Sequence, residues 1–183
     1  ANFHYFTKII QANPIVNVET ANIRFASYNV REFKMIYNLS SMQQIASYID
    51  SQQVNTLCLQ EVPAHCSIAE LKSVFTKFHY FMLTENKEGQ HQLAILSKFP
   101  LNAVETISFD ERPNCAIFAD LSLKKNKIRI GNCHLQTTNW NQVKGDLLPA
   151  ENAGYKWWSA IKTMSANFRL RGAQADRLRE AMD

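Results

Sequence analysis

The sequence contains few glycines and prolines, five of each among 183 residues, and it shows no internal repeat and no low-complexity segment. Hydrophobic residues make up 46% of the chain, so it can bury a sizeable core, and one globular domain is expected. The longest apolar runs are far shorter than the roughly 18 residues that a membrane span needs. A signal-peptide pattern is also absent, so we expect a soluble domain.

The net charge is small, and the cysteines show no paired spacing. The formal net charge is +4, which permits a phosphate-bearing or polyanionic ligand without requiring one. The four cysteines, Cys58, Cys66, Cys115 and Cys133, show no C-x-x-C spacing. Three of them lie in apolar runs that predict strands, and we therefore expect buried free thiols.

The first half of the chain predicts a β-α-β unit. Residues 1–21 lack periodicity and are interpreted as a leader or linker segment, and residues 22–183 are interpreted as the domain. Within the domain, residues 23–30 predict a strand, residues 40–50 a helix and residues 54–62 a largely apolar strand buried on both faces. Such a unit usually contains two parallel, neighbouring strands.

The second half predicts closely spaced strands and a long helix. Ser67 and Glu70 form a capping box ahead of a short helix over residues 68–75. An antiparallel meander is then expected, with strands over residues 79–84, 92–99, 101–109, 115–123 and 127–135. The helix over residues 155–182 carries an apolar stripe, and we expect this stripe to pack on a sheet. Its members are Trp157, Ile161, Met164 and Phe168, continued by Ala175, Leu178 and Met182.

Polar side chains occupy the carboxyl ends of three predicted strands. Asn29 ends the first strand, Glu61 lies near the end of the second, and Asn132 and His134 alternate along the last. In an open sheet, ligands gather at the carboxyl ends of parallel strands, so Asn29 and Glu61 are expected to face one crevice. A single carboxylate with an amide neighbour suits magnesium, which keeps several waters. An imidazole at His134 can donate a proton or a hydrogen bond to a phosphate oxygen.

Each of these residues also has an ordinary structural explanation. A glutamate at a strand end is often a solvated edge residue, and a histidine in an apolar strand is more often a packed side chain than a catalyst. Asn29 can simply form a turn. Arg31, which follows it, can be a solvated surface arginine. The residues taken singly therefore leave the function open.

The order of four motifs reduces these alternatives. The stretches SYNVREF (27–33), LCLQEV (57–62), LAILSKFP (93–100) and IGNCHLQ (130–136) occur in this order, with a helix between the first two. This ordered set resembles the endonuclease/exonuclease/phosphatase superfamily, which has the deoxyribonuclease I-like fold. The resemblance implies a four-layer α/β/β/α sandwich with mixed, mostly antiparallel sheets. It also implies hydrolysis of phosphodiester or phosphomonoester bonds with Mg²⁺ or Mn²⁺.

The resemblance assigns roles to individual residues. Asn29 matches the first active-site asparagine and Glu61 the metal-binding glutamate of the superfamily. His134 matches the histidine that contacts the scissile phosphate in some branches. Arg31 and Asn132 are assigned to substrate binding beside them. The substrate stays open among nucleic acid, a nucleotide, an inositol phosphate and a lipid head group, and a net charge of +4 does not favour nucleic acid strongly.

Two later motifs of the superfamily, a strand ending Gly-Asp-Phe-Asn and a near-terminal Ser-Asp-His, do not occur in the sequence. The Gly-Asp pair within residues 144–146 follows no apolar strand and is not a match. The absent residues are those expected to orient and deprotonate the attacking water. We therefore expect an incomplete domain, the amino-terminal two thirds, that is inactive by itself, while the intact protein is a hydrolase.

An incomplete second sheet has a further consequence. It would leave an exposed sheet edge, through which the chain can self-associate. The alternative to an enzyme is a catalytically dead binding or scaffold module of the same fold. Because some bacterial members carry membrane-spanning segments before this domain, attachment to a membrane through a preceding segment is also an open expectation.

Overall fold

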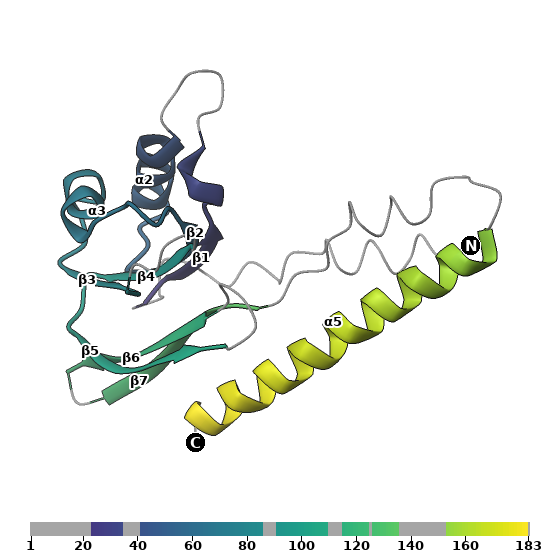
Figure 1. The fold of residues 1–183 in the computed structure, drawn as a ribbon. Coiled ribbons are helices and arrows are strands. Elements are labelled where there is room, and N and C mark those ends of the chain that lie inside the picture. The colour runs from purple at the N-terminus through teal and green to yellow at the C-terminus, as the bar shows by residue number, and fades with distance from the viewer. Residues whose placement is uncertain are drawn as a thin grey trace, which may run out of the picture.

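Two β-sheets packed face to face form the centre of the protein, and helices lie on the outer surfaces (Figure 1). The computed structural model describes residues 23–34, 41–85, 91–109, 115–124, 126–135 and 153–182. The predicted leader, residues 1–21, lies outside the described residues, and so does Gly145 of the rejected Gly-Asp pair.

The elements agree closely with the predicted ranges. The strands of the first sheet are β1 (Phe25–Asn29), β2 (Thr56–Val62), β3 (Tyr80–Leu83) and β4 (Gln92–Ser97). Those of the second sheet are β5 (Leu101–Ser108), β6 (Cys115–Leu123) and β7 (Asn126–His134). The helical elements are the short turn η2 (Arg31–Phe33), α2 (Ser41–Ser51), α3 (Ile68–Val74) and α5 (Ala153–Met182).

The predicted β-α-β unit is confirmed. Strands β1 and β2 are parallel neighbours, with Asn29 opposite Gln60 in the register. In the order β1-β2-β4-β3, β2 lies inside the sheet, which explains why most of its side chains are buried. Helix α3 begins as predicted, because the Ser67 hydroxyl accepts a hydrogen bond of 3.2 Å from the backbone N–H of Glu70.

The predicted five-stranded meander is divided between the two sheets. Strands β3 and β4 form an antiparallel pair in the first sheet, where β4 also pairs with β2. Only β5, β6 and β7 form a meander, in the second sheet. All six residues of β4 are buried, and a strand without a solvent-facing side needs cover on both faces. One face of β4 is covered by α2 and α3, and the other is covered by the second sheet.

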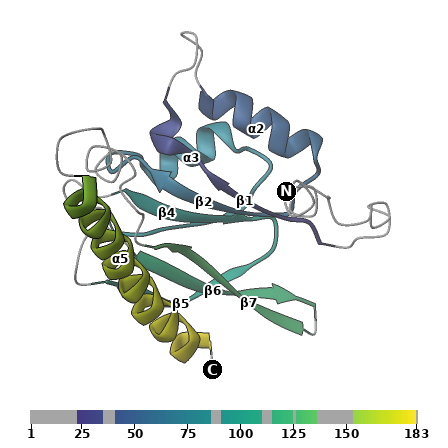
Figure 2. The same ribbon diagram turned by 90° about the vertical axis from the view of Figure 1, so that its right-hand side faces the viewer.

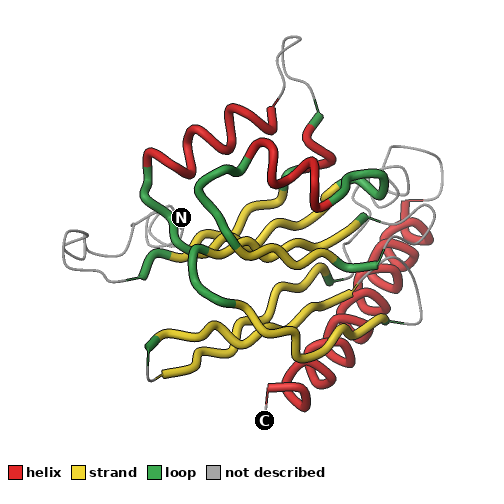
Figure 3. Tube along the Cα trace, turned by 90° about the vertical axis from the view of Figure 1, so that its left-hand side faces the viewer, coloured by secondary structure: helices red, strands yellow, loops and turns green. Residues whose placement is uncertain are grey.

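Three hydrophobic clusters define four layers, as the resemblance implied. The first cluster lies under α2 and α3 and includes Leu57, Leu59 and Leu71. The second lies between the sheets and includes Cys58 and Ile117, and the third lies between the second sheet and α5. Figures 2 and 3 show this layering from opposite sides. The fold is therefore an α/β/β/α sandwich with mixed, mostly antiparallel sheets.

Helix α5 packs through only the carboxyl-terminal part of the predicted apolar stripe. Trp157, Ile161 and Phe168 are 60%, 50% and 61% exposed, whereas Leu178 and Ala181 pack in the third cluster. In Figure 1 the amino-terminal half of α5 extends beyond the sheets, so its stripe has no sheet to cover it. None of the described helices, α5 included, has the length and apolar character needed to span a membrane.

The cysteines are free thiols, as expected, and burial differs among them. Cys58 and Cys66 are buried, and Cys115 and Cys133 are half-buried. Burial raises the pKa of Cys58 to about 11 and that of Cys66 to about 12. Because the thiolate is the reactive form, we expect these two thiols to be unreactive near neutral pH.

Gly131 in β7 permits close packing of a ring from the neighbouring strand. A Cβ atom at this position would lie 2.7 Å from Cε1 of Phe118, whose side chain is buried. We expect Gly131→Ala to lower the free energy of unfolding by about 1–3 kcal/mol in urea titration, because the ring cannot move aside in a packed core.

Gly172 provides the matched control. A Cβ atom there meets nothing within 4 Å, and α5 gains helix propensity. We expect Gly172→Ala to raise the free energy of unfolding by about 0.5–1 kcal/mol. Equal effects of the two substitutions would show that Phe118 does not restrict position 131.

Candidate active site

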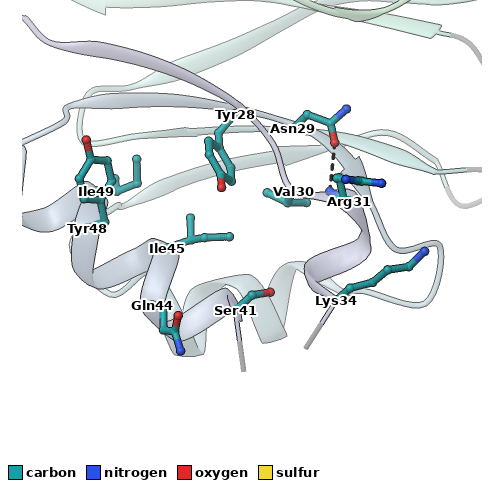
Figure 4. A pocket seen from close by; sticks show the side chains of 10 residues that line it. All are labelled: Tyr28, Asn29, Val30, Arg31, Lys34, Ser41, Gln44, Ile45, Tyr48 and Ile49. Atoms are coloured by element: carbon teal, nitrogen blue, oxygen red, sulfur yellow. Dashed lines mark hydrogen bonds between the residues drawn. The ribbon is translucent and has the colours of Figure 1, made fainter. Parts of the chain in front are cut away.

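Asn29 lies at the carboxyl end of β1 and uses both ends of its side-chain amide. Its Nδ2 donates a 2.7 Å hydrogen bond to Oε1 of Glu61. Its Oδ1 accepts a 3.0 Å hydrogen bond from the backbone N–H of Arg31 (Figure 4). Asn29 therefore fixes the position of a carboxylate and the start of the following turn at the same time.

A β-bulge turns Glu61 towards the second sheet. Between the pairs Leu59–Ala94 and Val62–Gln92, two residues of β2 face one residue of β4. Glu61 has a φ of 55°, in the left-handed region, which costs about 1–2 kcal/mol for a residue other than glycine. Strict alternation would place Glu61 on the helix-covered face with Leu59, whereas the bulge places it on the face that meets β7.

His134 completes a three-residue cluster from three strands. It is the last residue of β7, and its Nε2 lies 3.3 Å from Oε1 of Glu61. The side chains of His134 and Glu61 are 20% and 22% exposed, so the cluster is sheltered but open to solvent. The structure therefore brings together Asn29, Glu61 and His134, the first three residues that the sequence analysis assigned to the site. We name these residues the carboxylate cluster.

Asn132 lies deeper than the carboxylate cluster and connects the two sheets. It is 2% exposed, and its Nδ2 donates hydrogen bonds of 2.9 Å to the carbonyl oxygens of Leu59 and Ala94. Its Oδ1 accepts a 2.7 Å hydrogen bond from Nε2 of Gln60. Through these contacts Asn132 fixes the strand that carries Glu61.

Gln60 is a supporting residue that the sequence analysis did not assign. Its Nε2 also donates a 3.0 Å hydrogen bond to the hydroxyl of Ser27, so it links β1, β2 and β7. The available signal was a polar side chain at an inward position of an otherwise apolar strand. Gln60 therefore sets the spacing of the strands directly below the carboxylate cluster.

Arg31 begins a left-handed turn beside the carboxylate cluster. Arg31, Glu32 and Phe33 have φ values of 46°, 62° and 51°. The turn is held by Phe33, which is buried and packs its ring 6.5 Å from that of Phe75. Within the described part of the chain, the Arg31 guanidinium makes no hydrogen bond to the carboxylate cluster, and its side chain is exposed. Arg31 is thus adjacent to the cluster and available to a ligand.

The same turn makes two polar contacts through Glu32 that were not predicted from the sequence. Nε2 of His91 lies 2.7 Å from Oε1 of Glu32, and the Lys34 ammonium lies 3.0 Å from Oε2. The hydrogen bond from His91, followed by those from Lys34, lowers the pKa of the Glu32 carboxyl group. The contact with His91 joins the turn to the segment that enters β4.

Glu32→Gln is expected to reduce the loss of stability in acid. The lowered pKa of Glu32 means that its ionised form stabilises the fold at pH values above the usual carboxylate pKa. This contribution is lost as the pH falls through the lowered value. Urea titrations across this range should therefore show a shallower decline for Glu32→Gln than for the wild type. The exposed Glu180 supplies the control, and a decline equally shallow in Glu180→Gln would contradict the assignment.

The carboxylate cluster fits a small, hard divalent cation. Glu61 supplies one partly exposed carboxylate, and both of its described contacts are made to Oε1. Magnesium and manganese need few protein oxygens because they retain water ligands. The described residues contain no group of three or more His, Cys, Asp or Glu side chains that would form an all-protein metal cage. A cation with several water ligands fits this donor set.

Comparison of the sequence with known families identifies the class of protein. The sequence profile of the Endonuclease/Exonuclease/phosphatase family matches residues 26–180. The chain belongs to this family. The matched range contains every residue of the carboxylate cluster, and it extends from β1 to the last turns of α5.

Solved structures show the same fold at low sequence identity. Truncated TDP2 of Caenorhabditis elegans aligns with a TM-score of 0.54 and 20% identity over 72% of this chain and 58% of its own. An endonuclease/exonuclease/phosphatase from Beutenbergia cavernae aligns with a TM-score of 0.50 and 16% identity, over 64% of this chain and 39% of its own. TDP2 of D. rerio, solved with a single-strand DNA product, aligns with a TM-score of 0.50 and 17% identity over 68% and 50%.

The chain spans between 39% and 58% of the length of these three structures. A comparison with curated proteins found no match. The sequence profile establishes the family, and the solved structures show the fold.

Proposed function

We propose that the protein is a divalent-metal-dependent phosphoesterase, whose site is the carboxylate cluster. The observation that supports this most directly is that the Asn29 amide and the His134 imidazole both lie against one carboxylate oxygen, Oε1 of Glu61. They come from β1, β2 and β7, and the carboxylate reaches this face through a strained bulge. Strain of this kind at a site is often part of a functional arrangement.

Each residue has a distinct task in the proposed site. Glu61 holds the cation, and Asn29 fixes the orientation of the Glu61 carboxylate through its 2.7 Å hydrogen bond. A Mg²⁺ or Mn²⁺ ion held by Glu61 would polarise a phosphoryl oxygen and offset the negative charge that in-line attack by water creates. His134 donates a hydrogen bond or a proton to a phosphoryl oxygen, because its Nε2 lies beside the carboxylate that holds the cation, 3.3 Å from Oε1 of Glu61. Arg31 binds a neighbouring phosphate oxygen.

Asn132 supports this site rather than touching the substrate in our proposal. Its three hydrogen bonds engage both ends of its buried side-chain amide. It therefore acts as a positioning residue, which sets the distance between β7, with His134, and β2, with Glu61.

The substrate class is proposed as a phosphate ester, with nucleic acid, nucleotides, inositol phosphates and lipid head groups as candidates. One similar structure, TDP2 of D. rerio, was solved with a single-strand DNA product, which makes single-stranded DNA a suitable first natural substrate to test. The net charge of +4 is compatible with each candidate.

Hydrolysis of bis(4-nitrophenyl) phosphate tests the proposed activity. We expect the natural full-length protein to release 4-nitrophenol in the presence of Mg²⁺ or Mn²⁺, and we expect this release to stop when EDTA is added. Turnover that persists in EDTA would contradict metal dependence. Failure to hydrolyse this ester and the candidate substrates with either metal would support the binding module instead. The 183-residue chain, assayed in parallel, tests whether these residues are inactive alone.

A further inference from the structure

A pocket of about 590 Å³ lies between β1 and α2, on the helix-covered side of the first sheet (Figure 4). Its volume is within the range of roughly 300–1,000 Å³ that is typical of small-molecule sites. Asn29 and Arg31 form part of its wall, so it adjoins the carboxylate cluster at the end of β1. The sequence analysis did not predict this pocket, because its walls come from a strand edge and a helix that are separate in the sequence.

One part of the pocket is apolar and aromatic. Val30 and Ile49 are buried in its wall, and Ile45 lies between the strand and the helix. Tyr28 and Tyr48 are 47% and 64% exposed, and they extend from β1 and α2 respectively (Figure 4). Exposed aromatic faces of this kind are suited to stacking with a planar ring.

The other part of the pocket is cationic and contains an unpaired hydroxyl group. Arg31 and Lys34 line it, together with Ser41 at the start of α2. Lys34 is paired with Glu32 at 3.0 Å, whereas the Arg31 guanidinium forms no ion pair within the described part of the chain. The amino terminus of α2 adds partial positive charge. This end of the pocket is therefore complementary to an anion.

Among the residues described, Ser41 leaves a buried, unsatisfied hydroxyl group at this end of the pocket. Its side chain is 8% exposed, and its Oγ has no hydrogen-bond partner in the part of the chain that the structure describes. A buried hydroxyl without a partner is destabilising by about 1–3 kcal/mol, so such groups are rare and usually indicate a missing partner. In Figure 4 the Ser41 side chain lies between α2 and the η2 turn, at the end of the pocket that carries Arg31 and Lys34.

We propose that this pocket binds a nucleotide, that is, a planar aromatic ring joined to a phosphate group. The ring lies against Tyr28 and Tyr48, and the phosphate lies near Arg31 and the Ser41 hydroxyl. Because Glu61 faces the other side of the sheet, the pocket binds this ligand without a divalent cation. Asn29 and Arg31 lie at the boundary between this pocket and the carboxylate cluster, and binding measured without a metal tests the pocket separately from hydrolysis.

Calorimetric titration of the protein in EDTA tests the proposal, because EDTA prevents metal binding and metal-dependent turnover. We expect adenosine 5′-monophosphate to bind saturably. Adenosine lacks the phosphate, and ribose 5-phosphate lacks the ring. The Kd of each should be at least about tenfold higher than that of the nucleotide. Equal binding of all three probes, or no saturable binding of the nucleotide, would overturn the proposal.

Variants of the pocket locate the binding. Tyr48→Ala should weaken nucleotide binding about tenfold through lost stacking, and Arg31→Gln about tenfold through the lost phosphate contact. Tyr80→Ala removes a tyrosine that is 39% exposed on β3, outside the pocket, and should leave the Kd unchanged. Glu61→Gln should also leave the Kd unchanged. Equal weakening by Tyr48→Ala and Tyr80→Ala, or weakening by Glu61→Gln alone, would contradict a site between β1 and α2.

Discussion

Replacement of Glu61 by glutamine is expected to lower the kcat of metal-dependent phosphoester hydrolysis by at least about 10²-fold. The substitution preserves side-chain shape and leaves an oxygen that can accept the hydrogen bond from Asn29 Nδ2. It removes the negative charge that would hold the cation. The expected loss therefore arises from the metal site and not from unfolding, and it is measured as initial rates with bis(4-nitrophenyl) phosphate and saturating Mn²⁺.

The control for this substitution is Glu180→Gln, which removes the same charge from an exposed position of α5. It should leave turnover unchanged, and thermal melting should show both variants folded. A Glu61→Gln variant with wild-type turnover would remove Glu61 from the proposed site.

Asn132→Ala is expected to have the largest effect on stability among the site residues. The substitution removes three hydrogen bonds and leaves the Leu59 and Ala94 carbonyl oxygens and the Gln60 amide without this partner. Lost hydrogen bonds and newly unsatisfied buried groups together predict a decrease of about 3 kcal/mol in the free energy of unfolding. For a chain of this size, the Tm should fall by about 6–12 °C.

Asn126→Ala is the matched control, because Asn126 is an exposed residue at the beginning of the same strand. It should change the Tm by no more than a degree or so. If the Asn132→Ala and Asn126→Ala variants have the same Tm, the proposed connection between the two sheets does not contribute to stability.

The meeting of Asn29, Glu61 and His134 could be predicted because it follows from topology. A β-α-β unit makes β1 and β2 parallel, and parallel neighbours end at the same edge of a sheet. Motif order then indicated that the last strand of the meander would face them. The predicted fold class followed from the same resemblance, and the strand order and three hydrophobic clusters agree with it.

The bulge at Glu61 could not be predicted in this way. Alternation along β2 alone places Glu61 with Leu57 and Leu59, on the wrong face. Its actual orientation depends on a left-handed backbone that a glutamate rarely adopts, and on partners in β1 and β7 that are remote in the sequence. Local propensity contains no information about either.

The place of β4 and the packing of α5 depended on tertiary context as well. A continuous apolar strand such as β4 indicates burial on both faces but not which sheet it joins. In α5, Leu178 packs as predicted, whereas Trp157 and Phe168 do not. The sheet is shorter than the helix, and periodicity alone does not show where the covering surface ends (Figure 1).

Manganese titration followed by NMR is the most direct test of the proposed metal site. Mn²⁺ broadens resonances of nearby nuclei, so the Asn29 side-chain amide and the His134 ring should broaden first in the wild-type protein. The Glu61→Gln variant should need a much higher Mn²⁺ concentration for the same broadening. First broadening at residues remote from Glu61, or an identical response of the variant, would contradict a cation site at the carboxylate cluster.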